Sequence, residues 1–255
     1  MLFDSHAHYD DERFSQDRYE IINRVFESGV SYILNASSNI ASAVESISLA
    51  QEFEHVYAAV GIHPHNAGEI NDNTLVTLAD FSSNPKVVAI GEIGLDYYYD
   101  TAPREIQKHW FAKQIDMAKN LNLPVIVHDR DAHEDTVDIV VSENAKAVGG
   151  VFHCYSGSVE MAKVLLDNNF YISVGGAVTF KNARKAVEVV RYIPLEMLLI
   201  ETDCPYMTPE PYRGRRNDSG YLKLVAEKVA EIKGISYEEV ANTTTENAKR
   251  LFIIK

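Results

Sequence analysis

Cysteine and long apolar runs are both scarce in this chain. Its 255 residues include two cysteines, Cys154 and Cys204, which are too few for a disulfide framework. The longest apolar stretch that we find, at 56–62, is far too short to cross a bilayer. The opening residues, MLFDSHAHYDDERF, contain neither a basic segment nor a long apolar one, so they predict no signal peptide. We therefore expect a cytoplasmic protein that makes no contact with a membrane.

Positive charge is scarce as well. Lysine and arginine together number 24 against 37 acidic residues, and the formal net charge is -13. Broad electrostatic binding along duplex nucleic acid needs a basic face, so this class of protein is disfavoured. A small phosphate-bearing substrate or the end of a strand is still allowed, because bound metal cations reverse the local field.

What the chain does contain is a regular alternation of apolar strands and amphipathic helices, with no linker or low-complexity stretch between them. Apolar residues make up 46% of the chain, which is typical of a soluble globular protein. We expect strands at 2–5, 31–36, 56–62, 87–93, 124–128, 149–154, 171–175 and 197–203. Helices are expected at 10–28, 39–54, 72–83, 103–121, 131–143, 158–168 and 182–191. This order predicts an α/β fold in which residues 1–255 form one (β/α)8 TIM barrel domain; an open doubly wound sheet is the alternative.

Two local patterns make more detailed predictions about helices. Ile106, Trp110, Met117 and Leu121 have the spacing of one apolar helix stripe. The sequence Thr-Thr-Thr-Glu at 243–246 contains a capping box, which predicts the start of a short final helix.

Residue types that bind metals recur at the C-terminal ends of the predicted strands, which meet at the mouth of a barrel. They are His6, His8, Glu92, His128, His153 and Asp203. The two histidines of H-x-H leave the same side of an extended strand, so both can bind one cation. A carboxylate can bridge two cations about 3.5–4 Å apart. These residues predict a site for two divalent ions, and the ligand types suit Zn²⁺, Mn²⁺ or Mg²⁺.

The same residues predict a hydrolase that uses a metal-activated water. Asp203, at the end of the last strand, is the expected proton acceptor, and Glu92 is the expected bridge between the ions. A structural zinc site is disfavoured because such sites prefer cysteine. A scaffold protein that keeps the barrel without turnover is the alternative from another class; a missing ligand would favour it, and none is missing.

Several side chains near the expected ligands are candidates for substrate contact. His63 and His65 follow the third predicted strand, and we expect His63 to contact a substrate phosphate rather than a metal. Tyr97 begins a run of three tyrosines, where an aromatic ring can stack an unpaired base, and we expect at least one of the three only to pack its own loop. Arg130 has two equal interpretations: it steadies a phosphate, or it pairs with a nearby carboxylate.

A basic loop follows the last predicted strand and carries Arg213, Arg215 and Arg216. We expect these arginines to hold phosphates next to the metals. The alternative is a solvated turn whose arginines pair with surface carboxylates, because isolated charge clusters prove little.

The cysteines and the other histidines have simpler interpretations. Cys154 and Cys204 each follow an expected ligand directly, so strand alternation turns them away from the metals and into the packed layer. His55, His109 and His133 lie away from strand ends, and we expect them on the solvated surface.

Six blocks of the sequence occur in an order and spacing that resemble one known family. They are DSHAH, GIHPH, GEIGLDYY, PVIVHDR, FHCYSG and ETDCPY. From Asp4 to NAKRLF near the C-terminus, the chain is similar to the TatD family of metal-dependent hydrolases. The resemblance implies a metal-bearing barrel of the amidohydrolase-like group, with the six residues above as ligands and Glu92 as the bridge. One departure is Asp218-Ser219, where many relatives have Glu-Pro in the substrate loop.

The resemblance also implies an activity. We expect a 3′–5′ exodeoxyribonuclease, a phosphodiesterase acting on the ends of single-stranded DNA or RNA. The alternative is a deacylase that cleaves the ester of a D-aminoacyl-tRNA, with charged tRNA as substrate. Both would use the same metal centre and differ only in the electrophile, and neither implies an obligate protein partner.

Overall fold

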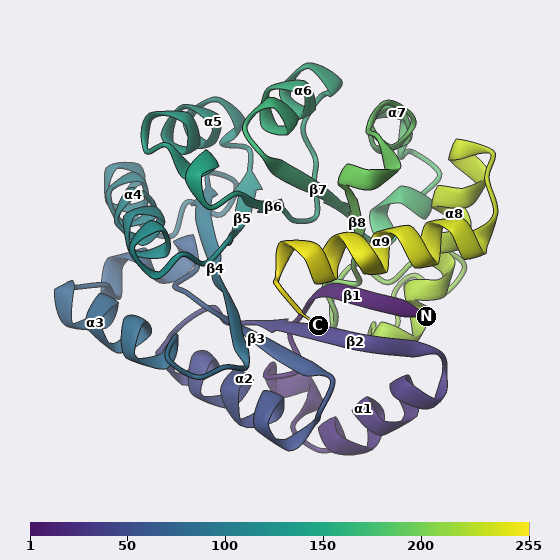
Figure 1. The fold of residues 1–255 in the computed structure, drawn as a ribbon, viewed down its shortest axis with the longest axis horizontal. Coiled ribbons are helices and arrows are strands. Elements are labelled where there is room, and N and C mark those ends of the chain that lie inside the picture. Colours follow the sequence, from purple (N-terminus) through teal and green to yellow (C-terminus); the bar gives the residue numbers. More distant parts are fainter. Residues whose placement is uncertain (255) are drawn as a thin grey trace.

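Eight parallel strands form the centre of the molecule, and helices surround them (Figure 1). The computed structural model describes residues 1–254. The strands are β1 (Leu2–Ala7), β2 (Val30–Ala36), β3 (Val56–Val60), β4 (Val87–Asp96), β5 (Val125–Arg130), β6 (Gly150–Phe152), β7 (Phe170–Val174) and β8 (Leu198–Ile200). Each strand pairs with the next one along the chain. The ring is completed by a parallel bridge between Ala7 and Cys204, and the predicted (β/α)8 TIM barrel is confirmed.

Each strand is followed by a helix on the outside of the ring, and one further helix comes after the last of these. The helices are α1 (Arg18–Glu27), α2 (Ile40–Glu52), α3 (Asp72–Phe81), α4 (Arg104–Leu121), α5 (His133–Ser142), α6 (Val159–Asp167), α7 (Arg184–Tyr192), α8 (Leu222–Lys233) and α9 (Tyr237–Leu251). Because every strand runs in the same direction, the loops after the strands all meet at one end of the barrel.

The barrel interior is packed, and its other end is covered. Side chains from all eight strands form one apolar cluster, which includes Phe3, Leu34 and Ile126 and also contains Ala248 of α9 and Phe252 just after it. The α9 helix lies across this end of the ring (Figure 1). The open end, at the C-terminal ends of the strands, is therefore where a substrate can enter.

The final helix begins earlier than the sequence predicts. The Ser236 side chain accepts a hydrogen bond from the backbone N–H of Glu239 and caps α9. Thr244 lies inside this helix, where its hydroxyl donates to the carbonyl of Val240. The predicted start at 243–246 is therefore wrong: Ser-x-x-Glu at 236–239 is the cap that the helix uses.

The predicted apolar stripe of α4 is also wrong in part. Met117 is buried, but Ile106 is exposed, because the face of α4 turned to the barrel is displaced by one residue. That face carries two buried glutamines. Gln107 accepts a hydrogen bond from the backbone N–H of Asp96 (2.9 Å), and Gln114 accepts one from that of Ile62 (2.8 Å). The glutamines therefore position the chain at the ends of β3 and β4.

Candidate metal centre

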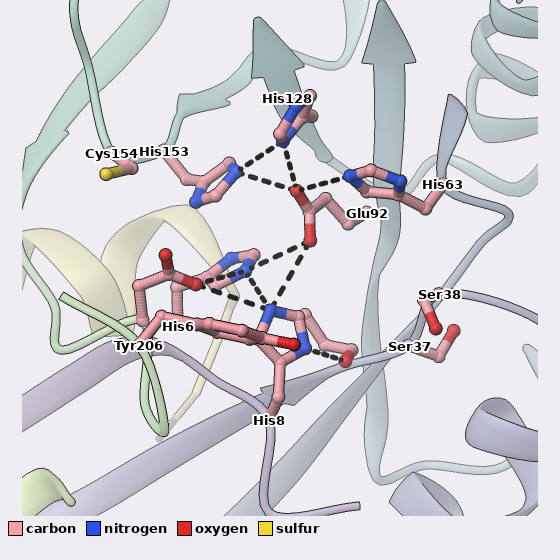
Figure 2. A network of polar contacts seen from close by, with 12 residues as sticks. His6, His8, Ser37, Ser38, His63, Glu92, His128, His153, Cys154 and Tyr206 are labelled. Carbon is pink, nitrogen blue, oxygen red and sulfur yellow. Dashed lines mark hydrogen bonds and ion pairs between the residues drawn. The ribbon is translucent and has the colours of Figure 1, made fainter. Parts of the chain in front are cut away.

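All six residues predicted as metal ligands meet at the open end of the barrel, and Figure 2 labels all of them except Asp203. His6 lies in β1 and His8 just after it, Glu92 in β4, His128 in β5, His153 after β6 and Asp203 after β8. Each side chain is buried or half-buried. The barrel geometry accounts for this convergence, because residues far apart in sequence occupy equivalent positions at neighbouring strand ends.

Glu92 lies between two groups of side chains. Its Oε2 is 3.3 Å from His6 Nε2 and 3.5 Å from His8 Nε2. Its Oε1 is 2.6 Å from His128 Nδ1 and 2.8 Å from His153 Nε2. Asp203 Oδ1 is 3.4 Å from His8 Nε2. We call His6, His8 and Asp203 the first ligand set, and His128 and His153 the second. Each set has one oxygen of Glu92 facing it.

Two hydrogen bonds indicate which histidine nitrogens are free to bind a cation. His8 Nδ1 is 2.9 Å from the carbonyl oxygen of Ala36, which can only accept, so this nitrogen carries a hydrogen. His128 Nε2 is 3.2 Å from a carboxylate oxygen of Asp96 and carries a hydrogen for the same reason. In the neutral rings, His8 Nε2 and His128 Nδ1 therefore direct lone pairs toward the oxygens of Glu92. Lone pairs facing a carboxylate need a positive charge between them, and this donor set fits a divalent cation in each ligand set.

The electrostatics of the cluster agree with this fit. Burial acts to raise the pKa of Glu92, but the charges of His153 and His63 and the hydrogen bond from His128 outweigh it, so the pKa lies well below its usual value. Burial acts to lower the pKa of His8, but its hydrogen bond to Asp203 and the charge of Glu92 raise the pKa to about 9. Without a cation, therefore, protons supply the positive charge that the carboxylates require.

We expect metal binding to displace those protons. A histidine binds a metal only as the neutral ring, so His8, with its pKa of about 9, must lose a proton at pH 7. Apparent metal affinity should rise between pH 6 and pH 9, by about tenfold per pH unit for each proton displaced. Calorimetric titration of the metal-free protein in two buffers of different ionisation enthalpy measures the protons released. Identical apparent enthalpies in both buffers would contradict this expectation.

Glu201 is a further residue of the site that the sequence reasoning missed. It is fully buried, and its Oε1 lies 3.5 Å from His153 Nδ1 and accepts a hydrogen bond from the backbone N–H of Cys154 (2.5 Å). Its Oε2 has no hydrogen-bond partner within the described residues. A carboxylate behind a metal-binding histidine orients the ring and raises its basicity. The signal was present, because Glu201 is two residues before Asp203 in ETDCP.

Replacing Glu201 with glutamine is expected to weaken metal binding by about 10- to 100-fold, the usual effect of removing such a partner. The amide keeps the size of the side chain but loses the charge beside His153. Competition with a chromophoric chelator measures the affinity, and Glu196→Gln, at an exposed position, is the matched control. Equal affinities for the two variants would show that Glu201 does not support the ligand.

Asp96 was also missed, and it connects a ligand to a loop. Its Oδ2 is 2.8 Å from His65 Nε2 and 3.2 Å from His128 Nε2. Its Oδ1 accepts hydrogen bonds from the backbone N–H groups of Tyr98 and Tyr99. One buried carboxylate therefore orients the His128 ring and also holds the loop that follows β4.

His63 and His65 both lie at the site. His63 Nε2 is 3.5 Å from Glu92 Oε1, and its ring is in edge contact with that of His128. The location of His63 allows contact with either a phosphate or a cation, because Glu92 and His128 also lie within a metal-binding distance of it. His65 instead bonds to Asp96.

The three tyrosines after β4 differ in their surroundings. Tyr97 donates a hydrogen bond to Asp135 (2.5 Å) and does not line the cavity above the metal centre. Tyr99 does line it, and more than half of its side chain is exposed. The Arg130 guanidinium lies over the ring of Tyr98 at 4.1 Å and near that of Tyr99 at 4.9 Å. Of these tyrosines, Tyr99 and not Tyr97 therefore faces the cavity, and Tyr97 is bonded to α5.

The structure does not bring the basic loop to the cavity. Arg213 stacks on Phe180 and Arg215 on Tyr212, at 4.1 and 5.3 Å. Arg216 pairs with Asp17 (2.6 Å). None of the three arginines lines the cavity above the metal centre, so the structure gives no support to the predicted phosphate contacts. Arg216 instead pairs with a surface carboxylate, as the alternative interpretation expected.

The loop is held to the barrel through its next residues instead. The buried Asn217 side chain donates to the carbonyls of Thr202 and Tyr206. At the departure from the family pattern, Asp218 accepts a hydrogen bond from Gly220 N–H, and Ser219 Oγ accepts one from the Tyr9 hydroxyl (2.8 Å).

Two of the simpler predictions need correction. Cys204 is buried as expected, but Cys154 is only half-buried and lines a cavity, with its sulfur turned away from Glu92 (Figure 2). His55 and His109 are exposed as expected. His133 is half-buried and pairs with Asp129 at 2.6 Å, because it opens α5 and faces the end of β5.

The cavity above the metal centre, which we call the main cavity, has a volume of about 1100 Å³. Glu92, His128, His153 and Asp203 lie at its floor, and the exposed ring of Tyr206 lies on its wall. This volume is slightly above the usual range of about 300–1,000 Å³ for small-ligand sites, so the cavity has room for a substrate as well as for metal ions. No helix within residues 1–254 has the length and apolar character needed to cross a membrane.

Comparison with known proteins agrees with this site. The family model described as "TatD related DNase" matches residues 3–253. The chain is similar to the Bacillus subtilis "Uncharacterized metal-dependent hydrolase YabD", at 48% identity over the full length of both proteins. It is also similar to the "3′-5′ ssDNA/RNA exonuclease TatD" of Escherichia fergusonii, at 33% identity over 98% of each chain.

A solved structure gives the same result. The fold is similar to the crystal structure of YJJV, a TatD homologue from Escherichia coli K12, with a TM-score of 0.93 and 30% identity over 100% of this chain and 98% of the other. The family model, the relatives and the fold all lead to one assignment. The chain belongs to the TatD family of metal-dependent hydrolases.

Proposed function

We propose that this hydrolase cleaves phosphodiester bonds at the 3′ end of single-stranded DNA or RNA. The observation that carries the proposal is the position of Glu92, whose two oxygens face two separate ligand sets at the floor of the main cavity. Two-metal sites of this kind are typical of enzymes that displace an oxygen from phosphorus. The relative from Escherichia fergusonii, named a 3′-5′ ssDNA/RNA exonuclease, supports the choice of substrate.

The ligand sets would hold two cations, one between His6, His8 and Asp203 and the other between His128 and His153, with Glu92 shared. When bound, such ions polarise the phosphate and lower the pKa of water. Whether they are zinc, magnesium or manganese is set by availability as much as by the ligands.

The protein's own groups then act on the substrate. Asp203 is half-buried and lies beside His8, whose hydrogen bond helps to keep the pKa of Asp203 below its usual value against the effect of burial. It is therefore ionised at neutral pH and can accept a proton from the attacking water. His63, within 3.5 Å of Glu92, is positioned for an oxygen of the phosphate. Arg130 and Tyr99 line the same cavity and would hold a phosphate and a base.

A 5′-labelled single-stranded oligonucleotide tests the proposal with the metal-loaded protein. A ladder that shortens from the 3′ end, and that disappears on chelation, is the expected result. A D-aminoacyl-tRNA is assayed in parallel. Release of the amino acid with intact nucleic acid would replace the proposed function with the deacylase, and inertness toward both would reject the substrate class.

A further inference from the structure

A second cavity of about 410 Å³ adjoins the metal centre, and we call it the side cavity. It shares His128, His153 and Asp203 with the main cavity. Its other walls come from the end of β5, from the loops after β6, β7 and β8, and from the start of α7. A group that occupies the side cavity would therefore be adjacent to the position where the bond is cleaved. The volume lies within the range of small-ligand sites.

The walls of the side cavity are largely apolar. They include Phe180 and Tyr155, with Ala177, Ala183 and Met207 around them. One face of the Phe180 ring is covered by the Arg213 guanidinium at 4.1 Å, which holds the ring in position. A fixed and partly exposed aromatic ring beside small apolar side chains suits a flat aromatic group, and nucleic-acid bases stack on such rings.

Two positive charges at this cavity have no carboxylate partner. Arg130 and Lys185 both line it, and neither takes part in an ion pair within residues 1–254. In a chain with a net charge of -13, these two cations put positive charge beside the metal centre. They would attract an anionic group that lies beside the apolar walls.

The far part of the main cavity has the opposite character. Three carboxylates line it, those of Asp10, Asp11 and Glu45. The nearby arginines are already in ion pairs, Arg18 with Glu45 and Arg13 with Asp11. A polyanionic strand would be repelled from these carboxylates and attracted toward Arg130 and Lys185. The side cavity has carboxylates as well, but Asp129 is paired with His133, and Asp203 and Arg130 are shared with the main cavity. Lys185 is therefore the cation that distinguishes the side cavity and favours it for the nucleotide next to the cleaved bond.

We infer that the side cavity binds one nucleoside of the substrate, with its base against Phe180 and a neighbouring phosphate near Lys185 and Arg130. The inference rests on the proposed function, and it assigns Phe180 and Lys185 as residues that select nucleic acid over other phosphodiesters.

If the base stacks on Phe180, the loss of kcat/KM caused by removing the Phe180 ring and the loss caused by removing the base should not be additive. The metal-loaded full-length enzyme is assayed on 5′-labelled single-stranded oligonucleotides that are normal or lack the base at the 3′-terminal or the penultimate position. Phe180→Ala should lower kcat/KM on normal DNA by about 5- to 100-fold, the range expected for one base stacked on an aromatic ring. On the oligonucleotide lacking the base that occupies the cavity, it should have almost no effect.

Tyr192→Ala is the matched control, because Tyr192 is an exposed aromatic residue at the end of α7 that does not line the side cavity. Its kinetics should equal those of the wild type on every oligonucleotide. Equal losses for Phe180→Ala on normal and base-free DNA would overturn the inference, since the ring would then act without touching a base.

Lys185 gives an independent test that does not depend on the packing of Phe180. Lys185→Ala should reduce the slope of log affinity against log salt by about 0.7, the value for one phosphate contact with a single strand. Arg184→Ala removes a neighbouring charge that does not line the cavity and should leave the slope unchanged. Equal slopes for the two variants would overturn the phosphate contact.

The failure of the proposed function can be distinguished from the failure of this inference. If the wild-type enzyme cleaves no nucleic acid, the proposed function fails. The inference is then tested by binding, with the affinity for the labelled oligonucleotide measured by fluorescence anisotropy. Binding weakened by Phe180→Ala and not by Tyr192→Ala would support the side cavity as a nucleoside site. Equal binding by both variants would reject it.

Discussion

Glu92→Gln is expected to lower kcat/KM by about 10³-fold or more on every substrate that the wild-type enzyme hydrolyses. The amide offers one oxygen and one NH₂ group, so it cannot present an acceptor to both ligand sets, as the two oxygens of Glu92 do. A bound metal contributes several kcal/mol of charge stabilisation, and each 1.36 kcal/mol changes the rate about tenfold. Steady-state kinetics, with metal content measured by mass spectrometry, provide the two readouts.

The matched control is Glu45→Gln, which removes a negative charge from the same cavity without touching a ligand set. Its metal content should equal that of the wild type, and Glu92→Gln should lose at least one equivalent. Full metal content together with full activity in Glu92→Gln would contradict the bridging role.

Asp203→Asn should have the second largest effect, a decrease in kcat of about 10²- to 10⁴-fold, the usual contribution of a general base. Asparagine is the informative substitution because Asp203 has a φ of 54°, in the left-handed region that asparagine also accepts. The fold should therefore be retained, and a circular dichroism spectrum equal to that of the wild type checks this point.

The pattern of constants separates proton transfer from binding. If Asp203 accepts the proton, kcat decreases while KM changes little, because the interaction matters in the transition state. An increase in KM with unchanged kcat would instead make Asp203 a binding residue. Since the pKa of Asp203 is below its usual value, wild-type kcat should show no titration of this carboxylate between pH 6 and pH 8.

The sequence alone was sufficient to predict the architecture and the convergence of the six candidate ligands. Apolar runs of strand length alternated with helices, and this order has one closed solution in which every strand end reaches the same mouth. His6, Glu92, His128 and Asp203 therefore meet because each lies in the C-terminal half of a buried strand or just after it, a property that is visible in the sequence without knowledge of any contact.

The sequence alone predicted the boundaries and buried faces of the helices less well than the barrel architecture. Thr243–Glu246 has the pattern of a cap, but Ser236 has it too, and burial of Thr244 against the barrel selected the earlier start. The buried face of α4 contains Gln107, which a search for apolar residues cannot identify. Its side chain is buried because it accepts a hydrogen bond from the backbone N–H of Asp96.

The surroundings of the metal centre were decided by tertiary structure. Glu201 and Asp96 act through His153 and His128, which are distant in the chain, and Tyr99 rather than Tyr97 faces the cavity. Arg216 forms its ion pair with Asp17, which lies on another loop. Strand ends are placed by a repeating backbone geometry that the sequence encodes locally, whereas the direction of a loop side chain depends on which partner the fold brings within reach.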